Sequence, residues 1–201
     1  TKNLNKTLNV LNQNYRFSID INKLKKFNKF STIAIIGMGG SILGAQEIYN
    51  LLEYKIKKKF YFFDDLDIKK NLFFQKKNLN KILFIFISKS GHTIETLSNF
   101  LNLNIIKKNS KNIIIISEKT NNPLYMIAKN FNFFFVEHKK NIGGRYSVLS
   151  EVGIVPAYLM GLNISKLSSN TYDYLIKRKK LFLKESVIKL ANLLKQNKIQ
   201  N

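Results

Sequence analysis

Hydroxyl groups and glycines that follow apolar runs are the parts of this sequence best suited to do chemistry. The richest stretch is Ser88–Thr93, where three hydroxyls, one lysine and one glycine lie within six residues, just before an expected helix. Hydroxyls and main-chain amides can hold the oxygens of a phosphate monoester, which is close to a dianion at neutral pH. The alternative is an ordinary helix cap, but a cap needs one hydroxyl and this stretch supplies three.

A glycine-rich turn at Gly37–Ser41 directly follows another apolar run, at 33–36. Glycines let the main chain approach an anion closely, and the helix that follows offers free N–H groups. A dinucleotide fingerprint would need a glycine where Ile42 stands, and a P-loop would need a lysine after Gly44, where Ala45 stands. Both nucleotide interpretations therefore fail, and a strand-to-helix turn without a ligand is the remaining alternative.

Arg145 is one of only three arginines among 34 basic residues, and two glycines precede it. Gly143 and Gly144 permit an unusual backbone and a close approach to a ligand. A guanidinium suits an anionic oxygen, either of a phosphate or of an enediolate formed during a reaction. The alternative is a surface arginine at the start of a helix.

The elements that must position these three stretches alternate between strands and helices. Short apolar runs predict five buried strands, at 33–36, 60–63, 82–87, 113–116 and 133–136. Helices are expected over 42–52, 68–77, 93–106 and 123–131. This alternation predicts an α/β fold, a doubly wound five-stranded parallel sheet flanked by helices. If the first and third strands are neighbours, as in the flavodoxin-like order, the first two stretches flank one crevice.

The alternation of strands and helices stops after Arg145. Residues 147–160 predict a helix that is kinked or broken at Pro156, and residues 167–194 predict one or two basic amphipathic helices. The sequence thus predicts a polar leader at 1–30, in which a short helix is expected over 4–11. A sheet domain at 31–162 and a helical C-terminal segment at 163–201 follow.

A net charge of +22 is typical of proteins that bind nucleic acids. Arginine is scarce, however, although its planar fork is what such proteins use most. The abundant residues Lys, Asn, Ile, Phe and Tyr all have codons poor in G and C, and the lysines are spread along the chain. We therefore expect a solvated basic surface and no nucleic-acid partner.

Membrane and metal sites are not expected either. The sequence has no apolar run of about 18 residues, which a membrane-spanning helix requires. It has no cysteine, which excludes disulfides and thiolate ligands. His92 and His138 have no histidine or cysteine three or four residues away, and hydrogen-bonded or solvated roles are expected for both.

Three stretches together, 38–41, 88–96 and 143–147, resemble the glucose-6-phosphate isomerase family in order and context. The first two alone are similar to any sugar isomerase (SIS) domain, and the Gly-Gly-Arg-Tyr-Ser stretch is what indicates this family. The bifunctional glucose/mannose-phosphate isomerases carry a close relative of it. The resemblance covers residues 33–162 and implies an SIS domain with a five-stranded parallel sheet.

The resemblance also implies a role for individual residues. Those that would bind the substrate are Gly40, Ser41, Ser88, Lys89, Ser90, Thr93 and Gly144. The hydroxyls of 88–93 would hold the phosphate with Lys89 beside it, and the other three residues would line the sugar site. Arg145 would stabilise the enediolate, and Glu95 would support it as a second catalytic residue. His92 departs from the family, in which Thr or Asn is more usual at this position.

By resemblance, the chain is the N-terminal part of an aldose–ketose isomerase that interconverts glucose 6-phosphate and fructose 6-phosphate, without metal, nucleotide or other cofactor. A cytoplasmic homodimer is implied, with active sites completed across subunits and no membrane or nucleic-acid partner. The alternatives are a non-catalytic module that senses a phosphosugar and a bifunctional glucose/mannose-6-phosphate isomerase.

The family's base glutamate, ring-opening histidine and lysine come from a second SIS domain and a C-terminal helix, which we do not find in this sequence. The segment 163–201 is expected to lead towards that second domain. We therefore expect this chain to bind a hexose 6-phosphate and to turn it over negligibly. The remaining glutamates are expected on the surface, namely Glu47, Glu118, Glu151 and Glu185.

Overall fold

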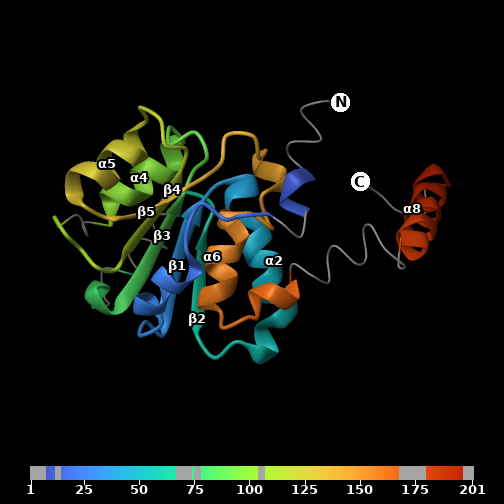
Figure 1. Cartoon of the computed structure of the whole chain (residues 1–201), viewed down its shortest axis with the longest axis horizontal. Helices are drawn as coiled ribbons and strands as arrows, with labels where there is room; N and C mark the ends of the chain where they lie inside the picture. Colours follow the sequence, from blue (N-terminus) through green and yellow to red (C-terminus); the bar gives the residue numbers. More distant parts are fainter. Residues whose placement is uncertain are drawn as a thin grey trace.

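The structure of the 201-residue chain is a computed structural model. It describes residues 8–11, 15–66, 74, 78–103, 107–167 and 180–196. Helices cover both faces of one central sheet (Figure 1). The helix expected over 68–77 therefore lies outside the described residues, apart from Phe74, which is fully buried.

The sheet has five parallel strands in the order β2-β1-β3-β4-β5. Their bounds are β1 (Thr32–Gly37), β2 (Lys59–Phe63), β3 (Ile82–Ile87), β4 (Ile113–Ser117) and β5 (Phe134–Glu137). The predicted doubly wound parallel sheet in flavodoxin-like order is thus confirmed. All side chains of β3 and β4 are buried, because both faces of these central strands are covered.

Two hydrophobic clusters lie on the two faces of the sheet. Alternate side chains of a strand point to opposite faces, so Ile33 and Ile35 join one cluster and Ala34 and Ile36 the other. Helices α2 (Leu43–Leu52) and α6 (Glu151–Leu159) cover the first face. Helices α4 (Ile94–Asn102) and α5 (Pro123–Phe131) cover the second (Figure 1).

Helix α4 packs on the sheet through Phe100 and leaves two of its apolar side chains exposed. Ile94 and Leu101 are 72% and 62% exposed, whereas Phe100 is fully buried. The Phe100 ring packs edge-on against Phe86 of β3, with 4.8 Å between the ring centroids. Asn99, also buried, donates a hydrogen bond from its amide to the Asp65 carbonyl. The buried Phe100 ring and the buried Asn99 amide therefore determine which face of α4 packs on the sheet.

The segment expected to be a polar leader contributes to the core. The 3-10 helix Ile21–Phe27 buries Leu24 and Phe27 in the cluster beneath α6, and the Phe27 ring lies 5.0 Å from that of Phe134 in β5. Residues 21–30 are therefore packed on the sheet domain rather than set apart from it. Of the helix expected over 4–11, the structure describes a 3-10 turn at Leu8–Leu11.

Beyond Ser150, most of the described residues are helical. Helix α6 runs through Pro156 without a break and ends at Leu159, and α8 spans Lys180–Lys195. The expected helices at 167–194 are therefore described only in part. Among the helices that the structure describes, none combines the length and the apolarity needed to cross a bilayer.

The orientation of α4 predicts different effects for two neighbouring substitutions. Phe100→Ala should lower the free energy of unfolding by about 3–5 kcal/mol, because it empties a buried site. Leu101→Ala should change the free energy by less than about 0.5 kcal/mol, because that side chain faces solvent. Urea denaturation followed by circular dichroism measures both. Equal losses in the two variants would show that α4 is oriented differently.

Candidate functional site

The three chemistry-bearing stretches leave the carboxyl edge of the sheet, where ligands bind in open α/β folds. Gly37, the last residue of β1, is the register partner of Ile87, the last residue of β3. A Cβ atom at Gly37 would lie 2.8 Å from the Ile87 carbonyl oxygen and 3.3 Å from Ser41 Cβ. The turn at Gly37–Ser41 and the stretch Ser88–Thr93 therefore start side by side.

The stretch Ser88–Thr93 folds around a pair of hydroxyls. Ser88 is buried, and its Oγ lies 2.8 Å from Thr93 Oγ1 and accepts a hydrogen bond from the Gly91 N–H at 3.1 Å. Gly91 has a φ of +68°, a left-handed conformation that favours glycine. Thr93 precedes α4 but its hydroxyl makes no capping hydrogen bond to that helix. Its role therefore differs from the ordinary cap considered above.

Asn122 supports this stretch from the neighbouring loop and was not singled out in the sequence. It is buried, and a Cβ atom at Gly91 would lie 1.8 Å from Asn122 Oδ1. Asn122 also caps α5, because its side chain accepts a hydrogen bond from the Tyr125 N–H at 2.9 Å. An asparagine directly before Pro123, the first residue of α5, was the available sequence signal.

The predicted phosphate-binding residues Lys89 and Ser90 have other contacts in the structure. Lys89 Nζ donates to the Lys140 carbonyl at 3.0 Å and lies 3.6 Å from Glu118 Oε1. Ser90 is exposed, and its Oγ accepts a hydrogen bond from the His92 N–H at 3.2 Å. Both residues lie on the same loop as Ser88, and their role at a phosphate stays a prediction.

The Arg145 stretch packs directly against the first turn. A Cβ atom at Gly40 would lie 2.4 Å from both the carbonyl carbon and oxygen of Gly144. The buried Ser147 hydroxyl lies 2.6 Å from the Gly144 oxygen and 3.2 Å from the Gly40 oxygen, and so bridges the two stretches. Among the described residues, no hydrogen bond or ion pair holds the exposed Arg145 guanidinium.

The predicted site residues thus form two groups. Gly40, Ser41, Gly144 and Arg145 form one group, and Ser88, Lys89, Ser90 and Thr93 form the other. The paired strand ends at Gly37 and Ile87 place the start of one group beside the start of the other. Glu95 lies in the first turn of α4, two residues after Thr93.

Glu151 corrects the expectation that the remaining glutamates lie on the surface. Its side chain is buried at the start of α6, with 1% exposure. One carboxylate oxygen accepts a hydrogen bond from the Ser18 N–H at 2.6 Å and the other from the Tyr15 hydroxyl at 3.1 Å. These two donors replace the water that burial removes. Burial and the nearby Glu151 carboxylate together raise the pKa of Tyr15.

His138 is also buried, just after β5, and its Nδ1 lies 3.1 Å from the Lys139 carbonyl oxygen. Burial lowers the pKa of His138 below its ordinary value of 6.5. The imidazole is therefore neutral at pH 7. In the part of the chain that the structure describes, no group of three or more potential ligand side chains could hold a metal ion.

The sequence comparisons identify related proteins. A family model described as phosphoglucose isomerase matches residues 6–170. The chain is 36% identical over 151 residues to a glucose-6-phosphate isomerase of Methanocaldococcus jannaschii, covering 74% of this chain and 37% of that protein. It is 35% identical over 169 residues to a probable glucose-6-phosphate isomerase of Methanococcus maripaludis, covering 80% and 38%. The chain thus spans less than two-fifths of the length of these relatives.

Solved structures share the fold at lower identity. A hypothetical protein from Thermus thermophilus matches with a TM-score of 0.69 and 19% identity, over 87% of this chain and 45% of that one. A tagatose-6-phosphate ketose/aldose isomerase from Escherichia coli matches with a TM-score of 0.59 and 16% identity, over 86% and 50%. A glucose-6-phosphate isomerase from Chlamydia trachomatis matches with a TM-score of 0.58 and 24% identity, over 74% and 30%. The fold is therefore the SIS-domain fold of sugar isomerases.

The contact between Gly40 and Gly144 predicts that an added methyl group destabilises the protein at position 40 but not at position 144. Gly40→Ala should lower the free energy of unfolding by about 1–3 kcal/mol, because its Cβ would overlap main-chain atoms of Gly144. Gly144→Ala is the matched control, since no atom lies within 4 Å of a Cβ there. Chemical denaturation measures both variants, and equal stability of the two would contradict the close approach.

Proposed function

Because this chain belongs to the phosphoglucose isomerase family, we propose that it is the phosphosugar-binding part of an enzyme that interconverts glucose 6-phosphate and fructose 6-phosphate. The observation that carries the proposal is the hydroxyl pair Ser88 and Thr93, 2.8 Å apart at the start of α4. This pair sits on the strand end next to the turn that contacts the Arg145 stretch.

The phosphate would bind to the stretch Ser88–Thr93. A helix N-terminus offers unpaired N–H groups and a positive dipole end, which favour an anion. The hydroxyls of Ser88, Ser90 and Thr93 can donate to phosphate oxygens. The Lys89 ammonium, which is paired with Glu118, would add positive charge beside the loop. A loop of this kind holds the ester without forming a covalent bond to it.

The sugar would lie between this loop and the Arg145 stretch, lined by Gly40, Ser41 and Gly144. In the reaction, a base takes the proton from C2 of the open-chain aldose and an enediolate forms. The hydroxyl proton passes from O2 to O1, and the base returns its proton to C1. The negative charge on that enediolate is what the Arg145 guanidinium would stabilise, with Glu95 in support.

The base itself would come from outside these 201 residues. Among the described residues, the buried Glu151 has both oxygens engaged by Tyr15 and Ser18. We infer that residues 31–162 form one SIS domain and that 163–201 lead towards a second. This second domain and a C-terminal helix would then supply the base glutamate, the histidine and the lysine. The active sites of a cytoplasmic homodimer would be completed across subunits.

Phosphate recognition predicts a difference between two sugars. The 201-residue chain should bind glucose 6-phosphate and not glucose, as measured by NMR titration. Thr93→Val, which keeps the shape and removes the hydroxyl, should weaken binding about 10- to 100-fold, because it deletes a hydrogen bond to a charged group. Ser110→Ala is the matched control. Ser110 precedes β4 and therefore lies at the amino-terminal edge of the sheet, away from the carboxyl edge that carries the site. Equal binding of the two sugars would contradict the proposal.

The origin of the base predicts an activity difference between two lengths of protein. The 201-residue chain should form negligible fructose 6-phosphate from glucose 6-phosphate in a coupled assay, whereas a protein of its relatives' length should turn over. Robust isomerisation by the 201 residues alone would mean that the base lies within them. Assay of the longer protein with mannose 6-phosphate distinguishes a bifunctional enzyme from a glucose-specific one.

A further inference from the structure

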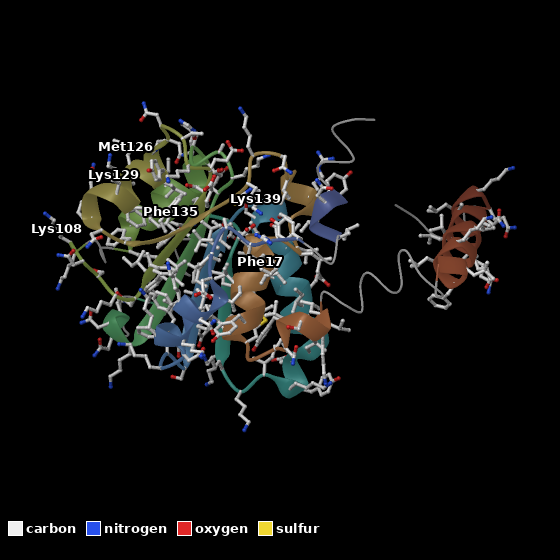
Figure 2. All side chains as sticks on the ribbon, in the orientation of Figure 1. Phe17, Lys108, Met126, Lys129, Phe135 and Lys139 are labelled. Carbon is white, nitrogen blue, oxygen red and sulfur yellow. The ribbon has the colours of Figure 1, made fainter. Side chains whose placement is uncertain are left out.

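The segment Tyr15–Ser18, which we call the strap, crosses the start of the loop that carries Arg145. Ser18 Oγ donates to the Glu137 carbonyl at the end of β5, at 2.7 Å. Lys139 donates from its ammonium to the Arg16 carbonyl, and the same ammonium lies 4.0 Å from the centroid of the Tyr15 ring. Figure 2 labels Lys139 together with Phe17, which lies within the strap. The strap therefore fixes the point at which this loop leaves the sheet.

The strap also fixes the other end of the loop. Glu151, the first residue of α6, receives one hydrogen bond from the Tyr15 hydroxyl and one from the Ser18 N–H. Both donors belong to the strap, more than 130 residues away along the chain. Because the carboxylate has only 1% exposure, solvent cannot easily replace these donors. Residues 138–150, the Arg145 loop, are thus held at both ends by one segment.

Between its two ends, the Arg145 loop touches the predicted sugar-binding turn. Gly144 lies against Gly40, and the Ser147 hydroxyl bridges the carbonyl oxygens of both. The Arg145 side chain itself has no hydrogen bond or ion pair within the described part of the chain. The position of its guanidinium therefore depends on the main chain of the loop, and so on the two anchored ends. A group that acts on a substrate needs such support, because even a small displacement of it lowers the reaction rate.

We propose that Glu151 and the strap residue Tyr15 are positioning residues that hold Arg145 at the sugar of a bound hexose 6-phosphate. This inference rests on the proposed function. Glu151 does not touch the substrate in this scheme, because both of its oxygens already accept hydrogen bonds within the protein. It acts through the Arg145 loop, which it fixes at the start of α6.

Two substitutions release the strap with little change of shape. Tyr15→Phe removes one donor, and Glu151→Gln removes the carboxylate charge that both donors contact. Tyr125→Phe is the matched control, because it removes a tyrosine hydroxyl on α5, on the opposite face of the sheet. Hydrogen exchange of the 201-residue chain should show faster exchange of amides 143–146 in the two strap variants, with the sheet amides unchanged. Unchanged exchange at 143–146 would overturn the proposal.

Ligand binding separates positioning from general destabilisation. NMR titration with glucose 6-phosphate should show about fivefold weaker binding in Tyr15→Phe than in the unaltered chain. Titration with inorganic phosphate, which in this scheme would contact only the Ser88–Thr93 stretch, should show no change. Equal loss for both ligands would mean that the substitution destabilises the whole site, and it would overturn the proposal.

A double-mutant cycle tests whether Tyr15 acts through Arg145. In the Arg145→Ala background, Tyr15→Phe should have no further effect on the affinity for glucose 6-phosphate, because the group that it positions is absent. A full additive effect would overturn the positioning role. If the unaltered chain binds no hexose 6-phosphate, the proposed function fails, whereas the hydrogen-exchange result still decides whether the strap holds the loop.

Discussion

The parallel pairing of β1 with β3 is the constraint on which the site depends. It places Gly37 opposite Ile87, so that two chain segments separated by fifty residues in the sequence leave the sheet at one point. The approach is close enough that Gly37 has no room for a side chain, since a Cβ atom would lie 2.8 Å from a carbonyl oxygen. The glycine-rich turn after β1 and the hydroxyl stretch after β3 therefore begin side by side.

Main-chain and hydroxyl groups make the contacts within the loops beyond this edge. The hydroxyls of Ser88 and Thr93 are hydrogen-bonded to each other, and the Ser147 hydroxyl bridges the carbonyl oxygens of Gly40 and Gly144. Ser88 and Ser147 are themselves buried, whereas Ser90 is exposed and Thr93 is partly exposed at this edge of the sheet. The two hydrophobic clusters lie behind them on either face and supply the rigid support.

The sequence was sufficient to predict the five strands and their parallel sheet, because strands buried on both faces form unbroken apolar runs between polar turns. It was also sufficient to place two of the three stretches, 37–41 and 88–93, directly after strands. It failed where burial depends on partners that are distant in the sequence. Glu151 resembles a surface carboxylate until Tyr15 and Ser18 are seen to donate to it. In a chain this rich in lysine and asparagine, the few apolar side chains of residues 21–30 did not stand out, although Leu24 and Phe27 are buried.

Gly91 joins the stretch Ser88–Thr93 to helix α5, and this contact limits how the stretch can vary among related sequences. Its left-handed backbone and its contact with Asn122 leave no space for a side chain, while Asn122 also starts α5. Exposed neighbours such as Ser90 and His92 are free of this double restriction. Natural drift and randomised libraries should therefore diversify position 92 readily, while 91 stays glycine unless residue 122 changes in the same step.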